Sequence, residues 1–181
     1  MSGDDSAADR ATNRADEPVE VVPYNAAWPA SFREERELLE AAIGGWAVGG
    51  IHHVGSTAVP GLAAKPIIDI LVGVEDLASS RACFPALARL SYAYAPYRAD
   101  EMHWFCKPGR SRRTHHLHVV PTRSRRFQDE LAFRDRLRAN PDQARDYAKL
   151  KHRLASRYEY DREAYTDAKA SFIRDVLERS H

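Results

Sequence analysis

Apolar side chains in the first half of the chain predict a helix followed by two strands. Between Trp28 and Ile43 large apolar residues recur at helical spacing, and Gly44–Gly45 predict the end of that helix. Residues 51–54 read as a strand. Residues 67–74 form an almost continuous β-rich apolar run, which is typical of a central strand covered on both faces. The second of these strands therefore belongs to the interior of a sheet.

The rest of the pattern places further strands before a helical end. Short strands are predicted at residues 19–22, around Tyr92, at 103–106 and at 114–120, and one helix is predicted over 77–90. The last third of the chain is predicted to be helical. The fold class is thus α/β (α+β), a mixed β-sheet with flanking helices and a helical C-terminal third.

The predicted C-terminal helices have a clear start signal and two apolar stripes. Asn140-Pro141-Asp142-Gln143 offers a cap residue, a first-turn proline and a glutamine at the third helical position. Apolar positions then recur at helical spacing in two helices. The first stripe contains Tyr147, Leu150, Leu154 and Tyr158, and the second contains Tyr165, Ala168, Phe172 and Val176.

Composition limits the chain to one core and gives no sign of a secreted or membrane protein. The 181 residues are 44% hydrophobic, enough for one sizeable core. Residues 1–17 contain no apolar side chain larger than alanine after Met1, so we expect a flexible tail before a single domain over residues 18–181. Two distant cysteines, Cys83 and Cys106, and the lack of a signal peptide favour a reducing, cytoplasmic location with both thiols buried.

Charge restricts the kind of partner. Lys and Arg number 27 against 26 Asp and Glu, a net charge of +1, which argues against general nucleic-acid binding and against a membrane surface. The segment from Lys107 to Arg126 nevertheless holds seven Lys or Arg and no acid. Such a run is usually a solvated loop, but the complete absence of acids favours local anion binding. Arg113, beside a predicted strand, is the expected phosphate contact.

A Gly-Ser turn follows the first internal strand. Gly55, Ser56 and Thr57 can bring backbone N–H groups and two hydroxyls close to a phosphate. Neither a Walker loop nor a GxGxxG motif is present. The simpler reading is that the glycine makes a turn and Ser56 caps a short helix.

Asp69 interrupts the apolar strand over residues 67–74. A buried, unpaired carboxylate is costly, so a metal ion, Lys65 or an arginine should face it. A structural ion pair is the alternative to a functional role.

Two histidines alternate on the strand predicted at 114–120. His116 and His118 share one face, so with Asp69 they would make three ligands for a divalent metal such as Mg²⁺, Mn²⁺ or Zn²⁺. They could equally contact a phosphate, act as acid and base, or simply lie on a polar sheet face.

Two lysines lie beside the apolar stripes of the C-terminal helices. Lys151 and Lys169 follow Tyr147 and Tyr165 by four positions each. Either both side chains reach a shared anion over the sheet, or they extend to solvent from the margin of the core.

The stretch from Gly55 to Asp69 resembles the signature of the GrpB family. Further blocks are similar to the same family and extend the match over essentially everything after the tail: 22–25, 28–29, 116–119, 133–138, 147–151 and 165–173. The resemblance implies a nucleotidyltransferase-like fold, because the family is similar to nucleotidyltransferases of the DNA polymerase β type. It also implies an accessory role as an alternative, since a GrpB-like domain is found fused behind dephospho-CoA kinase in some bacteria.

One departure from that enzyme type affects the expected chemistry. Those enzymes carry two acids at alternate positions of one strand to hold Mg²⁺, whereas Ile67 and Leu71 flank Asp69 on its face here. The departure argues against ordinary two-metal nucleotidyl transfer. We still expect a nucleotide- or phosphoester-processing enzyme, with Asp69, His116 and His118 as catalytic or metal-binding residues. A non-catalytic nucleotide-binding module and a metal-dependent phosphohydrolase are the alternatives, and the sequence does not indicate the oligomeric state.

Overall fold

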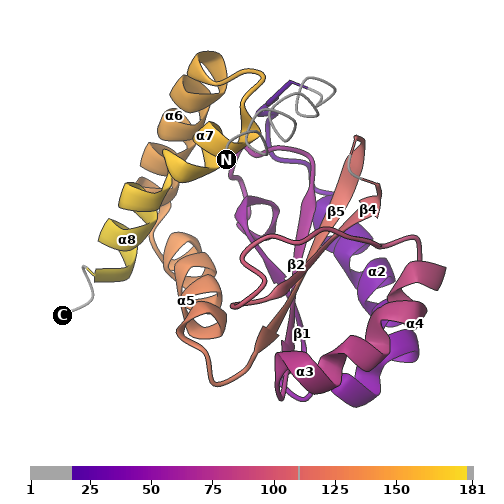
Figure 1. Ribbon diagram of the computed structural model, residues 1–181. Helices are drawn as coiled ribbons and strands as arrows, with labels where there is room; N and C mark the ends of the chain where they lie inside the picture. Colours follow the sequence, from indigo (N-terminus) through magenta and orange to yellow (C-terminus); the bar gives the residue numbers. More distant parts are fainter. Residues whose placement is uncertain (1–17, 110, 179–181) are drawn as a thin grey trace, which may run out of the picture.

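The fold is seen in a computed structural model, which describes residues 18–109 and 111–178 (Figure 1). A five-stranded mixed sheet in the order β1-β2-β5-β4-β3 forms its centre. The strands span Ile51–Val54 (β1), Ile68–Val74 (β2), Ala93–Tyr94 (β3), His103–Pro108 (β4) and Arg113–Pro121 (β5). Only β2 and β5 run parallel; the other neighbours in the sheet are antiparallel.

Helices cover both faces of the sheet (Figure 1). On one face lie α2 (Trp28–Ile43), α3 (Leu77–Ser80) and α4 (Phe84–Arg89). The helices α5 (Arg125–Ala139), α6 (Pro141–Arg157), α7 (Arg162–Asp167) and α8 (Ala170–Glu178) gather on the other side. Single 3-10 turns occur at Gly44–Trp46, Ser56–Ala58 and Arg81–Cys83. This is the predicted α+β architecture with a helical C-terminal third.

The main core lies between the sheet and α2 with α4. It contains the fully buried Leu39, Ile43, Ile70, Leu117 and Val119, and Cys83 belongs to it as well. Because residues alternate across a strand, the intervening positions of β2 and β5 face the other way. That second face holds Asp69, His116 and His118 above a smaller cluster around Leu71 and Val120.

Capping side chains fix the helix starts that the sequence indicates. Asn140 Oδ1 accepts the Gln143 N–H at 3.1 Å, and Pro141 opens α6 as predicted. Ser124 caps α5 in the same way, accepting the Phe127 N–H at 3.2 Å. Within the described residues no helix combines the length and apolar character that crossing a bilayer requires.

Three predicted elements differ from the structure. The helix predicted over 77–90 is divided, because Pro85 lacks the N–H that would continue it and instead stands in the first turn of α4. The final helix is also divided, into α7 and α8, with a tight turn in which the Lys169 N–H donates to the Thr166 carbonyl. The strand predicted at 19–22 is reduced to a single bridge from Val22 to Ala64. The predicted tail over residues 1–17 lies outside the described residues.

Candidate active site

A cleft of 1410 Å³ lies between the second face of the sheet and helices α5–α8. All ten residues that the sequence singles out are among those that line it: Gly55, Ser56, Thr57, Lys65, Asp69, Arg113, His116, His118, Lys151 and Lys169. They come from the turn after β1, from β2 and β5, and from the C-terminal helices. Residues up to 114 positions apart in the sequence (55 to 169) thus share one cavity.

Asp69 and His116 form a hydrogen-bonded pair across the parallel strands. Their Cα atoms are register partners, and His116 Nδ1 lies 3.0 Å from Asp69 Oδ1. Burial alone would raise the pKa of Asp69, but the hydrogen bond and charge of His116, with His118 and Lys65 nearby, hold it at about 2. Burial lowers the pKa of His116 despite Asp69. A neutral His116 must then donate from Nδ1, which leaves Nε2 as an acceptor.

His118, two positions further on the same face, is paired with Glu130 of α5. Its Nδ1 lies 3.0 Å from Glu130 Oε2, and Arg126 Nε lies 3.1 Å from the other carboxylate oxygen. Burial opposes the charged imidazolium, but the charge and hydrogen bond of Glu130, with Asp69, raise the pKa of His118 above its ordinary value. The pKa values of the two histidines are therefore shifted in opposite directions.

The same three side chains have the spacing of a metal site. Each of Asp69, His116 and His118 offers one ligand atom, and these three atoms all lie within 4.8 Å of one another. Both imidazoles contact a carboxylate through Nδ1, which leaves Nε2 as the nitrogen available to a ligand, an arrangement that is common around protein-bound metals. The donor set of two imidazoles and one carboxylate suits Zn²⁺ or Mn²⁺ better than Mg²⁺, which prefers oxygen.

The Gly-Ser turn is built around Asp69. Gly55 has φ of 69°, which favours glycine, and the space beside its Cα is filled by the Asp69 carboxylate. Thr57 is buried, and its hydroxyl donates to the Ile67 carbonyl (3.3 Å) and contacts His53 Nε2 (2.9 Å). The Thr57 hydroxyl thus holds the turn, and its role as a phosphate ligand stays a prediction.

Three lysines surround two tyrosines at one end of the cleft. Lys65 and Lys169 Nζ lie 4.9 and 4.3 Å from the Tyr165 ring centroid, and Lys151 Nζ lies 4.8 Å from that of Tyr147. Lys151 is 2% exposed and donates to the Ala63 carbonyl, so it does not extend to solvent. Burial, then the neighbouring lysines, lowers the pKa of Lys151 and of Lys169 to about 7. Such crowded ammonium groups favour a bound anion.

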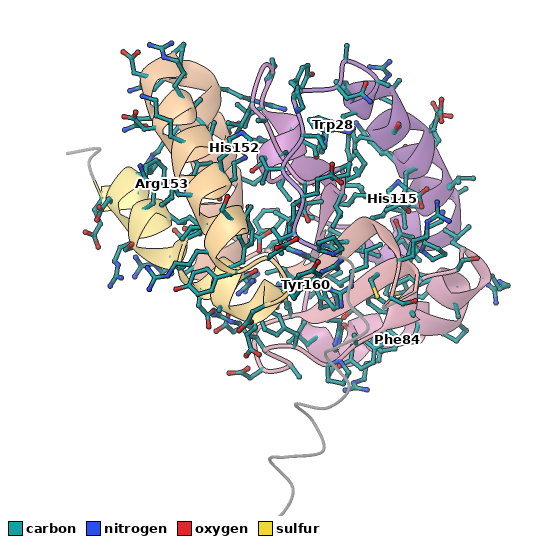
Figure 2. All side chains as sticks on the ribbon, turned by 90° about the horizontal axis from the view of Figure 1, so that it is seen from above. Trp28, Phe84, His115, His152, Arg153 and Tyr160 are labelled. Carbon is teal, nitrogen blue, oxygen red and sulfur yellow. The ribbon has the colours of Figure 1, made fainter. Side chains whose placement is uncertain are left out.

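The basic run from Lys107 to Arg126 is not one uniform patch. Lys107 points to the opposite face of the sheet, where its Nζ lies 2.9 Å from both carboxylate oxygens of the buried Glu35. His115 lies on that α2 side too (Figure 2), 3.9 Å from Glu35. Arg126 is paired with Glu101 and Glu130. Acids from outside the run thus pair with at least two of its seven basic residues, Lys107 and Arg126.

Arg113 lines the cleft and contacts an aromatic ring. Its guanidinium carbon lies 5.4 Å from the Trp104 centroid. Trp104 in turn lies 5.0 Å from the His116 ring, centroid to centroid. Trp104 therefore lies in contact with both Arg113 and His116.

Sequence reasoning missed Glu130 and the pocket tyrosines. Glu130 lies just beyond the acid-free run, and its only local signal is the helical spacing of four from Arg126. The sequence pattern places Tyr147 and Tyr165 in apolar stripes, and both do pack in buried clusters in addition to facing the lysines. No sequence pattern distinguishes a core tyrosine from one whose ring faces lysines in a cleft.

Comparison with known proteins identifies relatives over almost the whole chain. A family model described as GrpB protein matches residues 18–179. A UPF0157 protein of Pseudomonas aeruginosa is 42% identical, covering 94% of this chain and 71% of its own. The Glutamate-rich protein GrpB of Alkalihalophilus pseudofirmus is 37% identical, covering 88% and 94%.

A solved structure and a longer enzyme are also similar. The crystal structure of conserved protein GrpB from Enterococcus faecalis matches with a TM-score of 0.78 at 34% identity, covering 87% of this chain and 94% of that one. A dephospho-CoA kinase of Mycolicibacterium paratuberculosis is 31% identical over 90% of this chain, which spans 46% of that enzyme.

Proposed function

The chain belongs to the GrpB family, and from the contents of its cleft we propose that it binds a phosphorylated small molecule, specifically a nucleotide, and catalyses transfer or hydrolysis at the phosphoryl group. One observation carries this proposal. A turn able to approach a phosphate, three lysines and an Asp-His-His group line the same cleft. A cytoplasmic location, as expected from the sequence, belongs to the same proposal.

The phosphoryl group would lie between the Gly-Ser turn and the lysines. Backbone N–H groups after Gly55 and the ammonium groups of Lys65, Lys151 and Lys169 would offset its negative charge. Burial first, and then repulsion from the neighbouring lysines, lowers the pKa values of Lys151 and Lys169, and a bound anion would offset both effects. Arg113 would contact the same molecule.

The chemistry assigned to the two histidines is acid–base catalysis. An acceptor hydroxyl or water gives its proton to His116 Nε2 while its oxygen attacks phosphorus. The bond from phosphorus to the leaving oxygen breaks, and His118 gives that oxygen a proton. Asp69 and Glu130 orient the two rings, whose pKa values are shifted in opposite directions.

A metal-dependent phosphohydrolase is the second candidate. The observation that favours it is the spacing of the Asp69, His116 and His118 ligand atoms, all within 4.8 Å. A zinc or manganese ion held there would polarise the phosphoryl oxygen and supply an activated water. In that case neither histidine would carry a proton on Nε2.

A relation to DNA polymerase β-type nucleotidyltransferases remains part of the proposal. The mixed sheet and the Gly-Ser turn support it, whereas Leu71, fully buried beside Asp69, occupies the place where those enzymes carry a second acid. The similarity to part of a dephospho-CoA kinase supports a binding or accessory module as the third candidate.

Thermal unfolding with nucleoside triphosphates, with and without Mg²⁺, Mn²⁺ or Zn²⁺, tests these candidates. A nucleotide-induced rise in Tm, together with turnover that Asp69→Asn abolishes, supports the enzyme. A rise from Zn²⁺ or Mn²⁺ alone that is lost in His116→Ala supports the metal-dependent hydrolase. A metal-independent rise without turnover, lost in Arg113→Ala, supports the binding module. If no nucleotide and no simple phosphate changes Tm, the proposed function is wrong.

A further inference from the structure

The rim of the cleft beyond His116 is aromatic. Trp104 on β4 is half-buried, and Tyr97, on the loop between β3 and β4, is 37% exposed. Their rings meet edge to face, with centroids 6.4 Å apart and planes at 66°. Both line the cleft. Tyr97 and Trp104 thus form an aromatic corner at the margin of a charged cavity.

Resting on the proposed function, we infer that the phosphorylated ligand carries a planar aromatic ring, such as a nucleobase, and that Tyr97 and Trp104 bind this ring. The ring would lie on the β4 side of the cleft floor, and the phosphoryl group would lie on the β2 side. Tyr97 and Trp104 thereby gain a binding role. Neither residue belongs to the sequence motifs, and the phosphate chemistry does not need them.

The order of the strands supports this assignment. Across the floor of the cleft lie β1 with its Gly-Ser turn, β2 with Asp69, β5 with the histidines, and β4 with Trp104. Neighbouring strands are about 4.8 Å apart, so Asp69 and Trp104 are separated by about 10 Å of sheet. A mononucleotide also carries its base and its phosphate at opposite ends of one sugar. Such a molecule would lie across β5 with its phosphate over Asp69 and the lysines.

Charged groups around the corner fit a planar ring better than an aliphatic one. The guanidinium carbons of Arg98 and Arg113 lie 5.6 and 5.4 Å from the centroids of Tyr97 and Trp104. Planar guanidinium groups stack on aromatic rings and on nucleobases alike. A base inserted at this corner would therefore contact the aromatic rings of Tyr97 and Trp104, which meet edge to face, and a planar guanidinium group of Arg98 or Arg113.

Calorimetric binding of two probes, AMP and ribose 5-phosphate, tests the inference, because they share the sugar phosphate and differ in the base. Stacking on an aromatic side chain predicts that AMP binds at least about fivefold more tightly. Tyr97→Leu should reduce that ratio toward one while leaving the affinity for ribose 5-phosphate unchanged. Trp104→Leu, monitored by its melting curve, should do the same. Tyr160→Leu is the matched control, because Tyr160 is 66% exposed and does not line the cleft.

The outcomes separate this inference from the proposed function. If both probes bind equally to the native protein, the aromatic site does not exist, while the phosphate site stands. If AMP keeps its advantage in both Tyr97→Leu and Trp104→Leu, the base binds elsewhere and the inference is overturned. If neither probe binds, the proposed function fails together with it.

Discussion

The Asp69 carboxylate fills the space beside Gly55. A Cβ atom at residue 55 would lie 3.0 Å from both Cβ and Cγ of Asp69, and closer still to Oδ2. The turn and the central acid are therefore built as one unit. Neither can change shape without moving the other.

Replacing Gly55 by alanine should destabilise the fold more than the same change at Gly61. Both glycines have positive φ, 69° and 77°, so both substitutions carry backbone strain of about 1 to 3 kcal/mol. No atom lies within 4 Å of a Cβ at Gly61, so only Gly55→Ala adds the overlap with Asp69, which costs a further 1 to 3 kcal/mol or so. Urea unfolding of both variants measures the difference. Equal losses would contradict the close packing.

Glu130→Gln should lower the pKa of His118. The carboxylate charge and hydrogen bond are what raise that pKa against the effect of burial, and glutamine keeps the shape but not the charge. His116 is paired with Asp69 instead, so its pKa should respond less. Histidine NMR titration measures both values. Asp129→Asn, next to Glu130 and paired with Arg125, is the control. An unchanged His118 titration in Glu130→Gln would remove the basis for assigning it as the acid.

The protein should lose stability as the pH falls from about 6.5 to 4 because of His53. Burial lowers the pKa of this histidine from 6.5 to about 4, despite the nearby Asp69. The unfolded chain therefore binds a proton in this window while the folded chain does not, so acid favours unfolding, by about 3 kcal/mol in total. Urea unfolding across this pH range should show the loss, and His53→Gln should show a flatter dependence. His152→Gln, on the exposed surface of α6 (Figure 2), should keep the native pH dependence.

Anion binding near Lys151 and Lys169 should take up protons above neutral pH. Both pKa values are lowered to about 7, and a bound dianion would raise them again. Sulfate is a suitable probe, because its own charge does not change between pH 7 and pH 9. Its affinity should fall over this range, and calorimetry in two buffers of different ionisation enthalpy should show proton uptake at pH 8.

The lysine prediction has a matched pair of variants. Lys169→Met should weaken sulfate binding about tenfold, the usual effect of losing one charged hydrogen bond. Lys149→Met, on the exposed side of α6 and paired with Asp146, should bind as the native protein does. Equal affinities in the two variants, or binding without proton uptake, would show that the anion lies elsewhere.

Sequence patterns identified the floor of the cleft because strand periodicity is local. The apolar run ending at Val74 and the alternation through His116 and His118 each specify a face, and parallel pairing of β2 with β5 then brings Asp69 beside His116. The position of the Gly-Ser turn was predictable as well, because the turn begins directly where β1 ends. These relations need only neighbouring residues and one strand pairing.

Charge pairing was not predictable in the same way. Glu35 neutralises Lys107 from 72 positions earlier in the chain, and Glu130 reaches His118 from a helix that shows no clear apolar stripe. Such contacts depend on how helices pack on the sheet, which local spacing does not specify. The break at Pro85, which the single helix predicted over 77–90 does not include, does have a local cause, since proline removes a helical donor.

The cleft takes its floor and its lysine-bearing wall from different parts of the chain. Asp69 and both histidines lie on strands, whereas Lys151 and Lys169 belong to the helical end after residue 140. If the proposed anion site is correct, substitutions in the last forty or so residues would change which anion is bound, and how tightly, while leaving Asp69 and the two histidines in place. Family members that share the strands but differ in these helices would then differ in ligand and not in the residues of the floor.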